Sequence, residues 1–190
     1  MANDVFGYVY AVWIFLFIFW MIGAGVVKST ERREAASSRA SYTVFIIASY
    51  LLLFTRKLSV GFLGWRFVRE SSFIEYAGFA ITVAGALLAV WARVYIGRNW
   101  SSNVTIKQNH ELIQGGPYAL VRHPIYSGLL LATLGTAITI GEVRGLIALP
   151  LSFAGWQMKS MVEERFMREQ FGRQYVDYER RVRALIPFVY

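Results

Sequence analysis

The chain has 190 residues, of which 56% are hydrophobic and 17% are charged. Soluble domains average about 45–50% apolar and about 25% charged residues, so this composition excludes a disordered chain and predicts a membrane protein. The sequence contains no cysteine, which excludes disulfides, thiol nucleophiles and thiolate metal sites. In so apolar a chain, the net charge of +8 indicates cytoplasmic loops and contacts with anionic lipid headgroups rather than nucleic acid.

Three apolar segments in the first half of the chain predict transmembrane helices. Residues 5–27 carry no charge and would form a helix about 34 Å long, enough to cross a hydrocarbon core of about 30 Å. Residues 42–55 are a shorter second apolar run, and residues 73–96 are a third. Residues 58–68, between the second and third runs, combine aromatic side chains with glycines and are expected to lie at the membrane interface.

The second half contains two short apolar runs, residues 126–140 and 145–161, joined by a tight turn. Beyond them, apolar residues recur at helical spacing and predict an amphipathic helix over residues 162–182, whose register Gly172 could break. The expected fold is therefore an all-α integral membrane protein with about five transmembrane helices, the last two a short hairpin, plus a C-terminal amphipathic helix.

Basic residues concentrate in residues 28–40, in the polar stretch around residues 93–122 and from residue 159 onward. The positive-inside rule then predicts an N-terminus outside the cell and a cytoplasmic C-terminus and active site. We expect residues 1–96 to form a three-span membrane region and residues 97–190 to form a cofactor-binding region, both within one integrated domain. The oligomeric state is left open.

Side chains suited to chemistry occur in two separate segments, around Arg122-His123-Pro124 and at Glu163-Glu164. A hairpin of nearly equal arms returns its second end to the face where the first began, so these segments should lie side by side. Plainer explanations exist, because Pro124 suits the first turn of a helix and His123 could simply cap it. The two histidines of the chain are too few for a histidine metal site, and no metal is expected. Spacing alone predicts a polar pocket without naming a reaction.

Several blocks resemble the isoprenylcysteine carboxyl methyltransferase and phospholipid methyltransferase family over residues 97–190. The blocks are Gly116-Pro117-Tyr118, Arg122-His123-Pro124-Ile125-Tyr126, Glu163-Glu164 and Phe171-Gly172 followed by Tyr175 and Tyr178. The resemblance implies an S-adenosylmethionine (SAM)-dependent membrane methyltransferase that acts on a lipophilic acceptor at the cytoplasmic face, most simply the carboxylate of an isoprenylcysteine. The cofactor contacts that it implies are His110, Leu112, Gly116, Tyr118, His123, Pro124, Tyr126, Glu163 and Glu164.

Two residues receive catalytic roles under this hypothesis. Arg122 would orient the acceptor carboxylate with its planar guanidinium. A carboxylate is ionised at pH 7 and needs no base, whereas an amine acceptor would need one, and Glu164 would be the candidate.

Three alternatives remain open from the sequence. One is a phosphatidylethanolamine-type N-methyltransferase. Another is an NADPH-dependent sterol-type membrane reductase, whose similar Arg-His-Pro block usually continues Pro-Asn-Tyr, where this chain has Pro-Ile-Tyr. A non-enzymatic scaffold or transporter subunit is the third. The expected partners are a lipophilic or prenylated substrate and membrane lipids, with no nucleic acid.

Overall fold

A computed structural model describes residues 3–24, 30–33, 35–97, 105–107, 112–187 and 189. Nearly all of the described chain is helical, as predicted. The helices are α1 (Asn3–Ala24), α2 (Ala36–Phe54), α3 (Ser72–Ile96), α4 (Pro124–Ile140), α5 (Val143–Phe171) and α6 (Arg173–Arg181). Short 3₁₀ turns in the described chain are η1 (Arg56–Leu58), η2 (Gly61–Gly64) and η4 (Gly116–Ala119). Two short strands, β1 (Thr30–Arg33) and β2 (Thr105–Lys107), pair antiparallel, and this ladder was not predicted.

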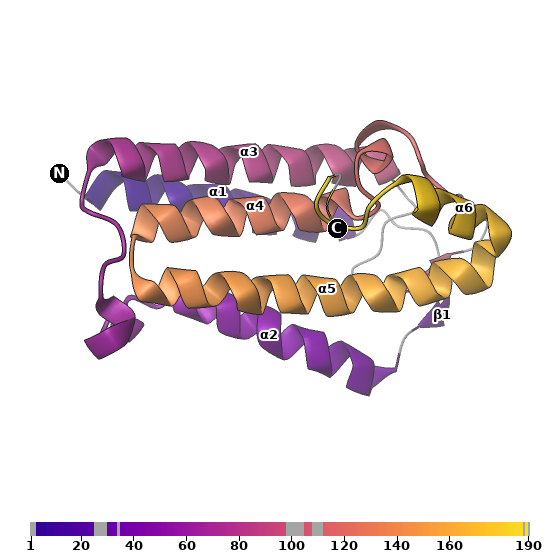
Figure 1. Ribbon diagram of the computed structural model, residues 1–190, viewed down its shortest axis with the longest axis horizontal. Coiled ribbons are helices and arrows are strands. Elements are labelled where there is room, and N and C mark those ends of the chain that lie inside the picture. Colours follow the sequence, from indigo (N-terminus) through magenta and orange to yellow (C-terminus); the bar gives the residue numbers. More distant parts are fainter. Residues whose placement is uncertain are drawn as a thin grey trace.

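Among the described elements, helices α1 to α5 run roughly along one axis of the molecule (Figure 1). Helix α4 packs on α3, and α5 packs on α2, while α1 lies against α3. The hairpin between α4 and α5 turns at Gly141, whose φ of 66° is left-handed and therefore suits glycine. Because α5 is much longer than α4, it continues past the first residue of α4 toward α6, and that overhang carries the site described below.

Small residues bring α3 and α4 into close contact. A Cβ atom added at Gly85 would lie 2.3 Å from the backbone nitrogen of Ala132, and one at Gly135 would lie 2.3 Å from that of Thr82. Buried threonine hydroxyls return their hydrogen bonds to their own helices, as Thr136 does to the carbonyl of Ala132 at 2.8 Å. Close backbone approach with internally satisfied hydroxyls is typical of helix packing in lipid.

The outer surface of the helices fits a bilayer. Three described helices are long and apolar enough to cross a membrane, namely residues 5–23, Ala36–Phe54 and Ser72–Ile96, and Pro124–Ile140 is a shorter apolar helix. Large apolar side chains stand exposed on α1, for example Phe17 and Ile22. With no water in the hydrocarbon core, helices that bond their own backbone and expose such side chains are suited to lipid. The chain is an integral membrane protein of almost entirely helical structure.

Two helix boundaries differ from the prediction. Helix α2 begins at Ala36 rather than near residue 42. Its first turns are polar, so they lie outside the apolar run from which the helix was predicted. Helix α5 does not end with its apolar run at residue 161 but continues to Phe171, about 43 Å in all. The expected separate helix over residues 162–182 was therefore wrong in its bounds. Its first half belongs to α5, and Gly172, with φ of 51°, separates the short α6 from it.

Candidate functional site

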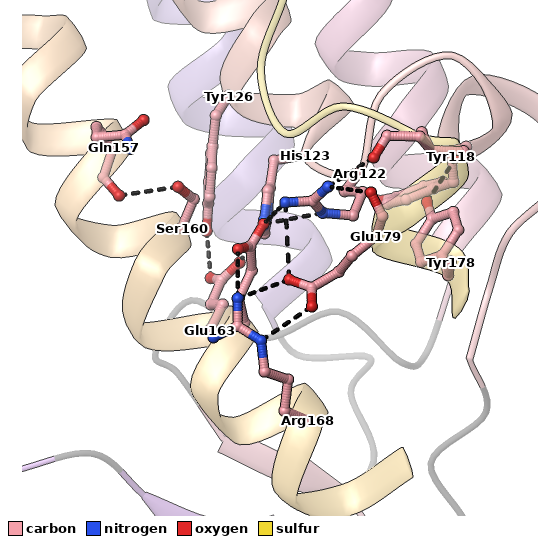
Figure 2. A network of polar contacts seen from close by, with 12 residues as sticks. Tyr118, Arg122, His123, Tyr126, Gln157, Ser160, Glu163, Arg168, Tyr178 and Glu179 are labelled. Carbon is pink, nitrogen blue, oxygen red and sulfur yellow. Dashed lines mark hydrogen bonds and ion pairs between the residues drawn. The ribbon is translucent and has the colours of Figure 1, made fainter. Parts of the chain in front are cut away.

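The overhang of α5 meets the first residue of α4 in a cluster of charged side chains. His123 is the residue immediately before α4, and Glu163 and Glu164 lie on the polar end of α5, beyond its apolar run. The juxtaposition expected from the hairpin is thus present. Figure 2 shows Arg122, His123 and Tyr126 directed at Glu163 and its neighbours on α5.

The His123 imidazole lies between the two carboxylates. Its Nδ1 is 3.3 Å from Glu163 Oε2, and its Nε2 is 3.1 Å from Glu164 Oε1. Burial alone would lower the pKa of the imidazole, but the hydrogen bonds and charges of Glu163 and Glu164 outweigh it and raise that pKa above its usual value. The site therefore favours a positively charged imidazole bound by two anions.

Glu164 is the centre of the ion-pair cluster. Its Oε1 accepts hydrogen bonds from Arg122 Nε at 2.9 Å and Nη2 at 2.5 Å, and its Oε2 lies 3.5 Å from Arg168 Nη2. Burial would raise the pKa of this carboxyl group, but His123 and Arg122 outweigh burial and lower the pKa to about 2. Arg168 in turn pairs with Glu179 of α6 at 2.7 Å. Glu164 is thus a fixed anion rather than a proton acceptor.

Glu163 faces a stack of aromatic rings. It accepts a hydrogen bond from the Tyr126 hydroxyl. The Tyr126 ring lies parallel to the His123 imidazole, with centroids 5.5 Å apart, and stacks on Trp156 at 4.7 Å. Burial would raise the pKa of Glu163, but His123 and the ammonium of Lys159 lower it. Both carboxyl groups therefore carry their charge, Glu164 at a buried position and Glu163 at a half-buried one.

Lys159 is a component of the site that the sequence reasoning missed. Its side chain is buried, and its Nζ lies 5.5 Å from the ring centroid of Tyr126, 5.6 Å from that of Trp156 and 5.7 Å from that of Tyr42 on α2. A cation over aromatic faces is stabilised by the negative face of each ring. The available signal was spacing, because residues 156, 159 and 163 share one face of a helix.

The C-terminal tail closes the site from the side of α4. The backbone nitrogens of Arg122 and His123 donate to the carbonyl oxygens of Arg183 and Ala184 at 2.7 and 3.0 Å. Arg122 Nη1 donates to the carbonyl of Val182 at 2.5 Å, and the Ser127 hydroxyl donates to that of Leu185, also at 2.5 Å. Arg122 thus joins the tail to Glu164, which sequence spacing could not reveal.

Four of the five remaining predicted site residues lie in the described part of the chain. Pro124 is the first residue of α4 and is buried, and Tyr118 is buried with its hydroxyl 3.4 Å from the carbonyl of Ala92 on α3. Gly116 has φ of 57°, and a Cβ there would lie 2.5 Å from the Tyr95 ring. Leu112 is half-buried at the start of its described segment, whereas His110 lies outside the described residues. Among the residues that are described, no group of three His, Asp or Glu side chains could hold a metal ion.

Known proteins that resemble this chain are methyltransferases. The sequence pattern of the phospholipid methyltransferase family matches residues 73–174. A probable protein-S-isoprenylcysteine O-methyltransferase of Oryza sativa subsp. indica is 32% identical over 125 residues, which cover 64% of this chain and 65% of that protein. Protein-S-isoprenylcysteine O-methyltransferase B of Arabidopsis thaliana is 29% identical over 127 residues, covering 64% of each chain.

A solved structure has a similar fold. The eukaryotic intramembrane Ras methyltransferase ICMT (isoprenylcysteine carboxyl methyltransferase) superposes with a TM-score of 0.57 at 26% identity, covering 79% of this chain and 53% of that one. The matched part of this chain therefore spans slightly less than two thirds of these two plant relatives and about half of the solved chain.

Proposed function

Because the chain belongs to the phospholipid methyltransferase family, we propose that it transfers a methyl group from SAM to the carboxylate of an isoprenylcysteine-like, lipophilic acceptor. The names of its relatives support this acceptor. The observation that carries the proposal is that the family's separate sequence blocks meet in one buried cluster around His123, Glu163 and Glu164. We further propose that residues 97–190 supply most of this site. They would form one integrated domain with residues 1–96, because Tyr42 of α2 also borders the site.

The residues of the cluster fit SAM by their chemistry. SAM supplies a methyl group on a positively charged sulfonium, together with an ammonium and ribose hydroxyls. Glu163 is an anion that can accept hydrogen bonds from the ammonium or from hydroxyls, and the stacked faces of Tyr126 and Trp156 favour a nearby positive charge. We propose that these residues hold SAM with His110, Leu112, Gly116, Tyr118, His123, Pro124 and Glu164.

Two cations are candidates for orienting the acceptor carboxylate. Arg122 has the planar fork that suits a carboxylate, but its donors already bond Glu164 and the tail carbonyls, so it would have to exchange one of those contacts. Lys159 carries its ammonium on the buried face of α5, one turn from Glu163. Holding the reacting atoms in line is an orientation effect worth up to about 7–11 kcal/mol.

A phosphatidylethanolamine-type acceptor is the second candidate, since the matching family is described by phospholipid methylation. An ammonium must lose a proton before it can accept a methyl group, so this reaction needs a base. Glu164 was the expected base, yet its pKa of about 2 makes it a weak proton acceptor. This electrostatic setting favours the carboxylate acceptor, which is ionised without help.

The test is an assay of the detergent-purified chain with methyl-labelled SAM. We expect label to enter an N-acetylated S-farnesylcysteine as a base-labile methyl ester, with little transfer to phosphatidylethanolamine. Saturable binding of the demethylated product should be lost in His123→Ala and retained in Glu169→Gln, an exposed position on the same helix. Transfer to phosphatidylethanolamine alone would replace the proposed acceptor, and NADPH binding without product binding would refute methyl transfer.

The cations can be separated with the same assay. If Lys159 orients the acceptor, Lys159→Met should raise the acceptor KM with little change in product affinity. If Arg122 does so, Arg122→Lys should raise that KM instead.

We also propose that the N-terminus lies outside and that the site faces the cytoplasm. This orientation can be tested by introducing single cysteines at residues 2 and 189 and labelling them in intact cells, because the chain has no cysteine of its own.

A further inference from the structure

A second polar cavity lies at the end of the bundle opposite the methyltransferase site. Its volume is about 400 Å³, and it lies among the first turns of α1, the segment before α3 and the turn between α4 and α5. Three arginines and three glutamates line it: Arg56, Arg66, Arg144, Glu70, Glu75 and Glu142. The cavity is within the size range of small-molecule sites and carries both signs of charge.

Four of these six side chains hold the surrounding helices together. Arg144 pairs with Glu142 at 2.6 Å and donates to the carbonyls of Leu52 and Leu53 at the end of α2. Arg66 lies 3.4 Å from Glu70 and donates to the carbonyl of Ile140, the last residue of α4. These contacts cap helix carbonyls and explain why the residues are charged.

Arg56 and Glu75 have no such explanation. Both line the cavity, and within the described part of the chain neither side chain makes a hydrogen bond or an ion pair. Glu75 is half-buried, in the first turn of α3, and Arg56 is exposed in η1. One cation and one anion whose side chains have no partner among the described residues therefore border the same space. A ligand that carries both charges would complement them.

The surroundings indicate which kind of molecule reaches this cavity. Phe62 and Trp65 are 57% and 65% exposed, beside the cavity on the segment between α2 and α3. Backbone hydrogen bonds fix this segment to the hairpin turn, from Val143 to the carbonyl of Trp65 at 2.8 Å and from Phe67 to that of Gly141 at 3.0 Å. Exposed Trp beside charged residues at helix ends is typical of the membrane–water interface, where phospholipid headgroups lie.

We propose that this cavity binds the headgroup of a zwitterionic phospholipid. Arg56, with Arg66 beside it, receives the phosphate, and Glu75 receives the ammonium, while the apolar first turns of α1 contact the lipid chains. The site is separate from the proposed methyl-transfer site and lies at the other membrane face, so the lipid bound here is a structural ligand and not a methyl acceptor.

The experiment uses the full chain, delipidated in detergent, with short-chain phosphatidylethanolamine, phosphatidylglycerol and diacylglycerol as probes and native mass spectrometry as the readout. We expect phosphatidylethanolamine to bind most tightly. Arg56→Gln should weaken its binding about tenfold, which is about 1.4 kcal/mol, because the phosphate loses a hydrogen bond to a charged group. Glu75→Gln should abolish the preference for phosphatidylethanolamine over phosphatidylglycerol. Lys57→Gln, which alters the neighbouring cation outside the cavity, should change neither.

The outcomes separate this site from an acceptor site. Phosphatidylethanolamine bound as a methyl acceptor would be lost in His123→Ala and retained in Arg56→Gln, which would overturn the proposal. Equal binding of all three lipids, or binding unaffected by both Arg56→Gln and Glu75→Gln, would overturn it as well. Among the described residues, the side chains of Arg56 and Glu75 make no hydrogen bond or ion pair. Folding of both variants is therefore expected, and unchanged binding of the demethylated product checks it.

Discussion

Replacing Glu164 with Gln tests whether the ion-pair cluster holds the site together. The glutamine keeps the shape of the side chain but removes the charge to which Arg122 and His123 bind. The Glu164 and Arg122 side chains are only 9% and 10% exposed, so water cannot replace the lost partner. Breaking one partner of a buried pair costs about 3–5 kcal/mol. For a chain of this length, that loss lowers the unfolding temperature by roughly 10 °C.

The assay is thermal unfolding in detergent at neutral pH, with Glu169→Gln as a matched control on the same helix. The control is exposed and should stay within about 0.5 kcal/mol of the parent chain. The double variant Arg122→Gln/Glu164→Gln should be less destabilised than the sum of the two single variants, because both lose the same contact. Equal unfolding temperatures for Glu164→Gln and Glu169→Gln would refute the reasoning.

Three further predictions concern other parts of the molecule. First, the pKa of His123 is raised, so its charge stabilises the fold fully below about pH 6.5 and less as the pH rises through the raised value. The difference in unfolding temperature between the parent chain and His123→Gln should therefore shrink from pH 6 to pH 9. Second, Gly85→Val should reduce the yield of folded protein in size-exclusion chromatography, because its Cβ would meet the α4 backbone, whereas Gly7→Ala, with no atom within 4 Å of the added Cβ, should not. Third, Leu185→Ala should cost about 2–5 kcal/mol of local stability and make the tail more sensitive to trypsin, and unchanged cleavage would contradict the docking of the tail.

The juxtaposition at the site was predictable because it depends on few quantities. A tight turn after α4 and helices of constant rise determine which residues of α5 lie beside His123. The resemblance then identified Glu163 and Glu164 as the residues to expect there. Hydropathy was a poorer guide to helix ends, because it reports which residues contact lipid rather than where the helix stops. Helix α5 continues through its polar residues as far as Phe171, and Gly172 ends it.

Contacts between distant backbone segments could not be predicted. The pairing of residues 121–123 with residues 183–184 leaves no periodic pattern in the sequence, because backbone groups make it. The packing of α3 on α4 did leave a pattern, the spacing of Gly78, Thr82 and Gly85 and of Gly128 and Gly135. That pattern is found only by a search for small residues, since small and hydroxyl side chains do not produce a peak in a hydropathy profile.

The unequal lengths of α4 and α5 explain why the charged cluster lies where it does. Helix α4 begins at Pro124, so the last part of α5 has no α4 residue beside it. Side chains on that part of α5 would face water if nothing covered them. The tail and α6 cover this surface, and Arg122 bonds both Glu164 and the tail carbonyls. A largely buried arginine and a buried glutamate are costly unless each is paired. The same contacts that pair them also fix the tail over the first turn of α4, so tail docking and charge pairing depend on each other.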